Sequence, residues 1–186
     1  MEYECFLQPS DQAASMASLS TNHEYFLSLL QDHRRLLLKV CWVYTNTSHD
    51  RDDLLQEIVG QLWKSFSKYD RSRNFSTWMY RVALNVAIDY QRRLRRLGRM
   101  NAGLGHDAAE IPAVIDDVTK QDQLRELRDL LNQQDDADRA LLLLYLEGHS
   151  LREIGEVLGI SESNVSTRLY RLKQSLRLSV QKKAGE

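Results

Sequence analysis

The chain has 186 residues, of which 25 are Lys or Arg and 26 are Asp or Glu, so its formal net charge is −1. Its two cysteines, Cys5 and Cys41, are too few and too isolated for a disulfide framework or a zinc site, which fits a reducing compartment. No apolar run reaches the length of a membrane span, and the first residues lack a basic start followed by an apolar core, so we expect neither a membrane segment nor a signal peptide.

The distribution of glycine, proline and apolar residues predicts an all-α fold with two small helical domains. The chain holds only 8 Gly and 2 Pro, and apolar residues recur with the helical period over long stretches. Residues 1–22 are polar and lack this period, so we expect a flexible tail there. Three glycines and one proline interrupt the period over residues 98–118, which predicts a flexible linker. The two domains are therefore expected at residues 23–97 and 119–183.

An amphipathic helix is predicted for residues 53–66. Its apolar face consists of Leu54, Leu55, Ile58, Val59, Leu62, Trp63 and Phe66. Its polar face begins with an acid and carries Asp53, Gln56, Glu57, Gly60 and Lys64 at helical offsets. Glycine costs a helix interior about 1 kcal/mol relative to alanine, so Gly60 indicates close approach by another molecule. The alternative is a solvated face that tolerates its glycine.

A second helix is predicted for residues 76–97, after a polar loop bracketed by Tyr69 and Phe75. Its apolar face consists of Met79, Val82, Ala83, Val86, Ala87, Tyr90, Leu94 and Leu97. The helix ends in a run of arginines at residues 92–96. Clustered arginine together with Phe75, Trp78 and Tyr80 is the mixture that holds single-stranded nucleic acid, through phosphate neutralisation and base stacking. The alternative places Trp78 and Tyr80 in the core and the arginines at a solvated helix end.

Residues 150–172 have the pattern of a helix-turn-helix. Ser150 and Ser161 are suitable N-caps for two successive helices, and Gly159 suits a left-handed turn between them. The first helix would bury Leu151, Ile154 and Leu158, and the second would bury Val165, Leu169, Leu172 and Leu176. The far side of the second helix carries Ser163, Asn164, Thr167, Tyr170 and Arg171, with Arg168 on the flank. Such a second helix can lie in a DNA major groove, whereas the alternative is an ordinary helical hairpin.

The charges near this motif are segregated, which favours DNA binding. Residues 121–162 carry ten acids and four bases, whereas residues 163–183 carry six bases and no acid. A solvated helix normally mixes the two signs, but a helix that faces phosphates does not. The near-neutral net charge of the whole chain therefore does not argue against a nucleic-acid partner.

Three segments, in a fixed order, carry a resemblance to a known family. They are residues 52–57 (Asp-Asp-Leu-Leu-Gln-Glu) with the following Trp63, residues 75–96 with their arginine run, and residues 150–172. In this order they resemble the polymerase-binding helix, the promoter-melting segment and the helix-turn-helix of an extracytoplasmic-function (ECF) sigma factor, a specificity subunit of bacterial RNA polymerase. Residues 23–97 then resemble sigma region 2, and residues 119–183 resemble sigma region 4. The second helix of the motif opens Ser161-Glu162-Ser163-Asn164, where relatives often have a Gly-Thr pair, so the resemblance does not give the promoter sequence.

The resemblance implies three sets of functional residues. The polymerase set would dock on the coiled coil of the largest polymerase subunit and comprises Asp53, Gln56, Glu57, Gly60, Trp63 and Lys64. The −10 set would bind and open the −10 promoter element and comprises Asn74, Phe75, Trp78, Tyr80, Arg81, Asn85, Arg92, Arg93, Arg95 and Arg96. The −35 set would contact the −35 element and comprises Ser163, Asn164, Ser166, Thr167, Arg168, Arg171, Lys173 and Arg177.

The partners implied are core RNA polymerase, promoter DNA and an anti-sigma protein, which in many relatives covers both DNA-binding domains. The five histidines are scattered, and the sequence holds no Ser/His/Asp set and no set with metal-ligand spacing. We therefore expect no enzymatic activity, no cofactor, no metal, no small-molecule substrate and no membrane insertion. The expected location is the cytoplasm.

Two other functions remain open at this point. A stand-alone helix-turn-helix regulator would explain residues 150–172 but would leave residues 53–66 and 75–96 without a role. It would also bind specific duplex DNA as the free protein. A membrane-surface or protein-docking module would use the arginines of residues 92–96, and it would bind anionic vesicles without any polymerase.

Overall fold

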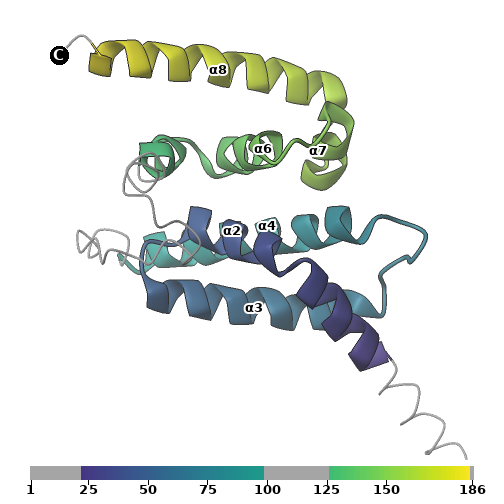
Figure 1. Cartoon of the computed structure of the whole chain (residues 1–186). Coiled ribbons are helices and arrows are strands. Elements are labelled where there is room, and N and C mark those ends of the chain that lie inside the picture. Colours follow the sequence, from purple (N-terminus) through teal and green to yellow (C-terminus); the bar gives the residue numbers. More distant parts are fainter. Residues whose placement is uncertain (1–21, 99–125, 185–186) are drawn as a thin grey trace, which may run out of the picture. The chain divides into compact units, whose positions relative to one another are not determined.

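The computed structural model describes residues 22–98 and 126–184 (Figure 1), and within these ranges all regular secondary structure is helical. The expected all-α fold is confirmed. The chain divides into two compact units, one that ends at Arg35 and one that begins at Leu36. Among the described residues, none forms a helix that is both long and apolar enough to cross a membrane.

The expected tail at residues 1–22 and linker at residues 98–118 lie outside the described residues except at their edges. Asn22 opens a helical segment at residues 22–32, in which Phe26 is buried. Gly98 has a φ of 67°, the left-handed conformation that glycine adopts readily after a helix.

The first helical group consists of α2 (Arg34–Tyr44), α3 (Ser48–Phe66) and α4 (Phe75–Arg96). Helices α3 and α4 pack along each other. The side chains with almost no exposure come from all three helices and include Val40, Cys41, Leu54, Ile58, Leu62, Met79, Ala83 and Ala87. Burial of one large apolar side chain contributes about 1.5–3 kcal/mol, so this seam holds the group together.

Side-chain caps fix where α3 and α4 begin. Thr47 Oγ1 accepts a hydrogen bond from the Asp50 amide at 3.0 Å, so α3 begins at Ser48, ahead of the expected start at residue 53. Asn74 Oδ1 accepts a hydrogen bond from the Ser76 amide at 3.0 Å. Helix α4 therefore begins at Phe75, next to its expected start.

The second helical group consists of a helical segment at residues 126–132 and of α6 (Asp136–Leu146), α7 (Leu151–Leu158) and α8 (Glu162–Ala184). The three labelled helices pack against one another, and α8 extends along the group in Figure 1. The fully buried side chains of this second group include Leu141, Leu144, Ile154 and Val165.

A buried arginine ties this second group together. Arg139 is 2% exposed, and its guanidinium donates to the carbonyls of Leu131 at 3.1 Å and Asn132 at 3.3 Å. These carbonyls lie at the end of the 126–132 segment, where the last carbonyls of a helix lack partners within the helix, and the Leu131 carbonyl also accepts from the Gln134 amide at 3.1 Å. Arg139 therefore supplies a C-terminal cap, and burial lowers the pKa of its guanidinium.

The buried faces are narrower than the sequence pattern predicts. Trp63 and Leu97, both expected on apolar faces, are 41% and 67% exposed. Several other expected core residues are half-buried, namely Leu55, Val59, Val82, Val86, Leu94, Leu151, Leu158 and Leu176. A seam between two helices covers a narrow stripe of each, so apolar residues on its flanks keep contact with solvent. Leu97 also lies beyond the last residue of α4.

Candidate functional site

A groove between α3 and α4 gathers residues of two expected sets. It has a volume of about 720 Å³ and is lined by Gln56, Glu57, Gly60, Gln61, Lys64 and Ser65 of α3 and by Val82, Asn85, Val86, Asp89 and Arg93 of α4. The groove therefore combines most of the polymerase set with Asn85 and Arg93 of the −10 set. Arg93 Nη2 donates to the Glu57 carboxylate, with one contact at 2.7 Å. This hydrogen bond raises the pKa of Arg93.

Gly60 lines this groove, and the space beside its Cα is open. A Cβ atom built at Gly60 would meet nothing within 4 Å. No packing contact among the described residues therefore requires glycine at this position. Since glycine still weakens a helix interior, the open surface at Gly60 agrees with a residue that leaves room for a partner.

The other two members of the polymerase set lie outside the groove lining. Asp53 is half-buried, and its Oδ2 lies 3.5 Å from His49 Nε2. The Trp63 ring stacks on that of Phe66 with a centroid distance of 6.4 Å. Trp63 was expected in the core, but it is exposed. Part of its ring is therefore accessible, on the same helix as the groove residues.

Two of the three aromatic members of the −10 set are core residues. Phe75 is 7% exposed and Tyr80 is 1% exposed, so neither ring can stack on a base in this structure. The expectation is corrected for these two residues, because α4 turns both rings into the interior. Trp78 is half-buried, and the centroid of its ring lies 5.0 Å from the ring centroid of Tyr69 and 5.4 Å from that of Phe75. Trp78 as a whole therefore remains partly exposed.

The polar members of the −10 set are exposed but not equally available. Arg81, Asn85 and Arg96 are exposed on α4. Arg95 makes two hydrogen bonds to the Asp136 carboxylate, at 2.7 and 2.9 Å. Arg92 lies 3.7 Å from Asp89 and 3.9 Å from Asp136, and Asn74 is committed to capping α4. The arginine run is therefore partly neutralised by carboxylates, which sequence reasoning missed.

The helix-turn-helix has the caps that its sequence predicts. Ser150 and Glu153 form a reciprocal capping box at the start of α7. The hydrogen bonds from Ser150 lower the pKa of Glu153. Gly159 ends α7 with a φ of 70°, and the Asn164 amide donates to Ser161 Oγ at 3.3 Å at the start of α8. The turn and both N-caps are confirmed.

A second glycine of this motif is held in a close contact. Gly155 is buried within α7, and its carbonyl accepts a hydrogen bond from the Ile160 amide at 3.1 Å. A Cβ atom at Gly155 would lie 2.7 Å from the Ile160 carbonyl oxygen. A side chain at residue 155 would therefore force the turn to shift away from α7.

The far side of α8 presents most of the −35 set to solvent. The exposed members are Ser163, Asn164, Ser166, Thr167, Arg171 and Arg177. On the opposite side, Val165, Leu169 and Leu172 are buried, as expected. The exposed polar side chains are thus held on one side of a helix whose other side is anchored in the core.

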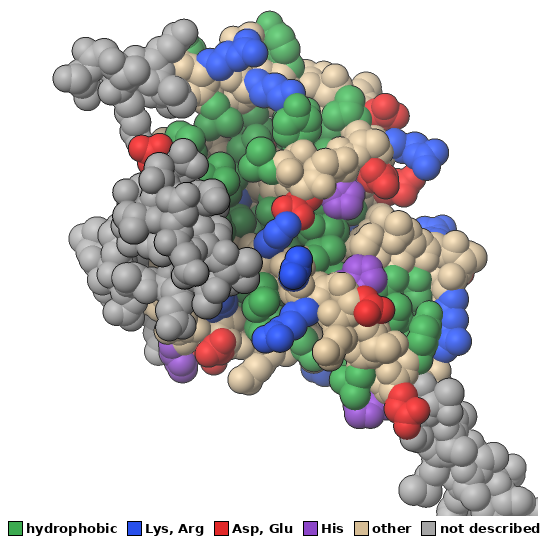
Figure 2. All heavy atoms as spheres, in the orientation of Figure 1, with side chains coloured by type: hydrophobic (Ala, Val, Ile, Leu, Met, Phe, Trp, Pro, Cys, Tyr) green, Lys and Arg blue, Asp and Glu red, His purple; other side chains and the backbone are tan. Residues whose placement is uncertain are grey.

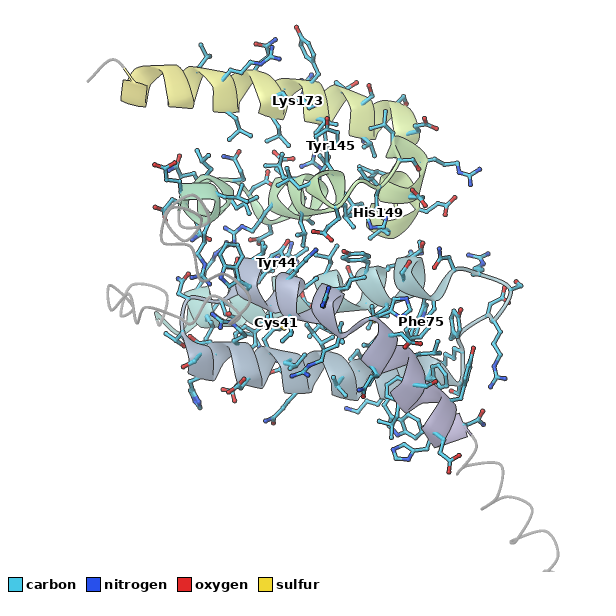
Figure 3. The ribbon with its side chains drawn as sticks, viewed as in Figure 1. Cys41, Tyr44, Phe75, Tyr145, His149 and Lys173 are labelled. Atoms are coloured by element: carbon cyan, nitrogen blue, oxygen red, sulfur yellow. The ribbon has the colours of Figure 1, made fainter. Side chains whose placement is uncertain are left out.

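Two basic members of the −35 set are held by α6. Arg168 Nε donates to Asp138 Oδ1 at 2.9 Å, and the Arg168 side chain is 31% exposed. Lys173 Nζ donates to Tyr145 Oη at 2.7 Å and lies 4.1 Å from the ring centroid (Figure 3). Both contacts fix the direction of α8 relative to α6. The expected accessibility of Arg168 is corrected, because its guanidinium is engaged by a carboxylate.

Two family models match the chain in order. Sigma-70 region 2 matches residues 29–97, and Sigma-70 region 4 matches residues 124–176. Among curated proteins, the chain is 27% identical over 166 residues to the ECF RNA polymerase sigma factor SigW of Bacillus subtilis, covering 84% of this chain and 89% of the relative. It is 29% identical over 163 residues to the ECF sigma factor SigM of the same organism, covering 84% of this chain and 93% of the relative.

Two solved structures share the fold. CnrH, in complex with the cytosolic domain of CnrY, matches with a TM-score of 0.64 at 23% identity, covering 92% of this chain and 97% of that chain. The sigma factor RpoE of Bartonella quintana, in complex with the anti-sigma factor NepR, matches with a TM-score of 0.63 at 18% identity, covering 85% of this chain and 98% of that chain.

Proposed function

Because the chain belongs to the ECF sigma factors of the sigma-70 family, we propose that it binds core RNA polymerase and directs it to specific promoters. It recognises the −35 and −10 elements and promotes promoter melting. The observation that carries this proposal is the order of the two family matches, with the helix-turn-helix in the second. A stand-alone helix-turn-helix regulator would leave residues 29–97 without a role.

The groove between α3 and α4 is the proposed polymerase-binding surface. An acidic and amide-rich rim formed by Gln56 and Glu57, beside the open position at Gly60, suits a partner helix that approaches closely. The accessible edge of Trp63 extends this surface with an aromatic side chain, a residue type enriched at protein interfaces.

The proposed −10 surface lies on the exposed side of α4. Arg81, Asn85 and Arg96 are available to bind strand phosphates and bases, and the accessible part of Trp78 can contact a base. Phe75 and Tyr80 support this surface from the core. Asn74 contributes by fixing the start of α4 next to the polar loop.

Substitution of Asn85 and Arg96 by alanine tests the −10 surface. Loss of two polar contacts to opened DNA should cost about 1–3 kcal/mol together, at about 0.5–1.5 kcal/mol each, so open complexes should form roughly ten-fold less readily. Permanganate footprinting of the holoenzyme on a promoter measures the opened bases. Initial promoter binding by the same variant is the control, because it should change less. Permanganate reactivity equal to wild type would contradict this assignment.

The proposed −35 surface is the exposed side of α8. Base-edge contacts give sequence preference, whereas phosphate contacts position the protein. We assign base reading to Ser163, Asn164, Ser166, Thr167 and Arg171, and phosphate contact to Arg177. Arg168 and Lys173 position the helix through their bonds to α6.

Selection on randomised −35 elements separates base readers from phosphate contacts. Arg171→Ala or Asn164→Ala should cost about 1–3 kcal/mol on the preferred promoter and relax the preference at one or two positions. Arg177→Ala should weaken all promoters alike and reduce the salt dependence of binding. If both the Arg171 and Asn164 variants return the wild-type consensus, the base readers lie elsewhere.

The proposal extends to the absence of catalysis and to regulation. The protein itself performs no chemistry, since the polymerase core makes RNA, and it acts in the cytoplasm where its partner acts. Sigma factor RpoE was solved in complex with an anti-sigma factor. We infer that an anti-sigma protein also binds this chain and covers its polymerase and DNA surfaces.

Assembly with the polymerase is the direct test of this function. The purified chain is mixed with core RNA polymerase and passed through a size-exclusion column. Co-elution in a stoichiometric complex is expected, whereas separate elution would contradict the proposal. Binding to anionic vesicles without any affinity for polymerase would instead favour a membrane-surface module.

A further inference from the structure

Two carboxylates at the start of α6 hold one basic residue of the −35 set. Arg168 Nε donates to Asp138 Oδ1 at 2.9 Å, and Arg168 Nη2 donates to the same oxygen. Asp135 Oδ1 lies 3.7 Å from Arg168 Nη2. The side chains of Arg168 and Asp138 are 31% and 22% exposed, so water and salt screen this pair less than an ion pair on the open surface. The positive charge of Arg168 is therefore largely cancelled within the second helical group.

The cap of α6 leaves the Asp138 carboxylate available for this contact. Asp135 is the N-cap residue, and its Oδ1 accepts hydrogen bonds from the amides of Ala137 and Asp138, at 2.9 and 2.8 Å. The Asp138 side chain takes no part in this cap. It lies in the first turn of α6, where the helix dipole favours a negative charge. Asp138 can therefore serve as a charged partner for Arg168.

The other basic members of the −35 set keep their charge. Arg171 and Arg177 are exposed on α8. Lys173 is held by the hydroxyl and the ring of Tyr145, which is an uncharged side chain. On the face drawn in Figure 2, Lys and Arg side chains lie along α8. Arg168 differs from these residues because its partners are carboxylates.

The cancelled charge lies within the part of α8 that we assign to base reading. Asn164 lies about one turn before Arg168, and Arg171 lies about one turn after it. Arg168 and Arg171 also line one hollow of about 370 Å³, together with Asp138 of α6. Lys173 and Arg177, whose charges are kept, lie further toward the C-terminus of α8. The helix therefore withholds one positive charge among its base readers and offers others beyond them.

An arginine released at this position would bind DNA of any sequence. Contacts to phosphates position a protein on the duplex but carry no sequence information directly. One added phosphate contact strengthens binding to every site alike, and it steepens the slope of log affinity against log salt by about 0.9. A guanidinium uses the same fork of donors for a carboxylate and for a phosphate. While Arg168 bonds to Asp138, that edge of its guanidinium is not available to DNA.

From these contacts we propose that Asp138 limits the affinity of the −35 surface for DNA of any sequence, by holding Arg168 away from the phosphates. The inference rests on the proposed function of α8. Both residues belong to the second helical group, so the pair acts in the free chain and in the holoenzyme alike. Asp138 sets the affinity and leaves the sequence preference to the base readers. Because binding at the −35 element is then weak, tight promoter binding requires both elements at once.

Substitutions on both sides of the pair test this inference. Asp138→Asn removes the charge at nearly constant size, and Asp138→Ala also removes the acceptor. Arg168→Gln breaks the same contact but leaves no positive charge for DNA. The control is Asp129→Asn, which changes the net charge equally at an exposed position of the same helical group. Fluorescence anisotropy measures the affinity of each full-length variant for a short duplex of mixed sequence, over a range of salt concentrations.

Both Asp138 variants should bind the mixed-sequence duplex more tightly than the wild-type chain. The gain should be about ten-fold at about 50 mM salt and should shrink by a factor of about 3.5 at about 200 mM, because the salt slope steepens by about 0.9. Arg168→Gln and Asp129→Asn should stay close to wild type. In the holoenzyme, selection on randomised −35 elements should return the wild-type consensus for Asp138→Asn, because a phosphate contact strengthens all sequences alike.

Three results would overturn the role of Asp138. If the Asp138 variants match the Asp129 control in affinity and salt slope, a released Arg168 does not reach the phosphates. If Asp138→Asn and Arg168→Gln lose affinity equally, the pair only holds α8 against α6. If Asp138→Asn returns a different consensus, Asp138 controls the sequence preference and not the general affinity.

Selection with the wild-type holoenzyme separates this inference from the proposed function. If the wild-type holoenzyme shows no −35 preference, the proposed −35 surface fails, whereas the anisotropy measurements still decide whether Asp138 restrains DNA binding. If the wild-type holoenzyme selects a −35 element but the Asp138 variants bind mixed-sequence DNA as the control does, this inference fails and the proposed function stands.

Discussion

Reversing the charges of Asp53 and Glu57 to lysine is expected to abolish assembly with core RNA polymerase. Both carboxylates lie on the polar side of α3, and Glu57 lines the groove that we assign to the polymerase. Like charges placed opposite each other in an interface cost several kcal/mol, so affinity should fall more than a hundred-fold. Size-exclusion chromatography with core polymerase measures the loss, and circular dichroism should show unchanged helical content.

Two further variants make this result specific. Glu126→Lys with Asp129→Lys changes the net charge equally, at exposed positions outside α3 and α4, and should assemble normally. Arg93→Ala removes the partner of Glu57 without reversing a charge, and it shows whether the pair itself matters. Normal assembly of the Asp53 and Glu57 double variant would exclude this face from the polymerase interface.

A methyl group at Gly155 is expected to damage the helix-turn-helix. The new Cβ would lie 2.7 Å from the Ile160 carbonyl oxygen, so the turn between α7 and α8 must shift. Overpacking of this kind costs about 1–3 kcal/mol, against a gain of about 1 kcal/mol from replacing glycine by alanine in a helix. The melting temperature should fall, and promoter selectivity at the −35 element should weaken because the start of α8 is displaced.

Gly60→Ala is the matched control for this experiment. The same substitution at Gly60 meets no atom within 4 Å, so the helix-propensity gain of about 1 kcal/mol should appear as a higher melting temperature. Thermal unfolding by circular dichroism compares the two variants directly. A melting temperature that rises for both would mean that the Gly155 contact relaxes without cost.

These two glycines also mark how far the sequence predicts the structure. The unfavourable helix propensity drew attention to Gly60, which has open space, and not to Gly155, which has a backbone contact. Propensity reports the local cost of a glycine but not which atoms approach it. The pattern of caps and apolar offsets was sufficient for the helix-turn-helix, because Ser150, Gly159 and Val165 act within a few residues of their partners.

Contacts between distant residues could not be predicted in this way. The sequence assigns Arg168 and Arg95 to DNA-binding surfaces, but in the structure they bond to Asp138 and Asp136 of α6. Both acids belong to a stretch that the sequence identified only by its excess of negative charge. Charge composition predicted a basic α8, whereas the pairing of individual charges depends on how the helices pack.

The aromatic residues show the same limit. Phe75, Trp78 and Tyr80 are spaced along one helix, and composition alone could not separate the core from the nucleic-acid surface. The structure buries Phe75 and Tyr80 and leaves Trp78 half-buried. The sequence allowed each of these rings to lie in the core or at the surface. Only the packing of α4 against α3 shows that Trp78 is the ring that lies between the two.

The central claim is that this chain makes core RNA polymerase selective for promoters. Transcription of fragmented genomic DNA by core enzyme, with and without the chain, followed by mapping of RNA 5′ ends, tests it most directly. With the chain present, initiation is expected to concentrate at a small group of sites that share two sequence elements upstream of each start. Initiation that is equally scattered with and without the chain would contradict it.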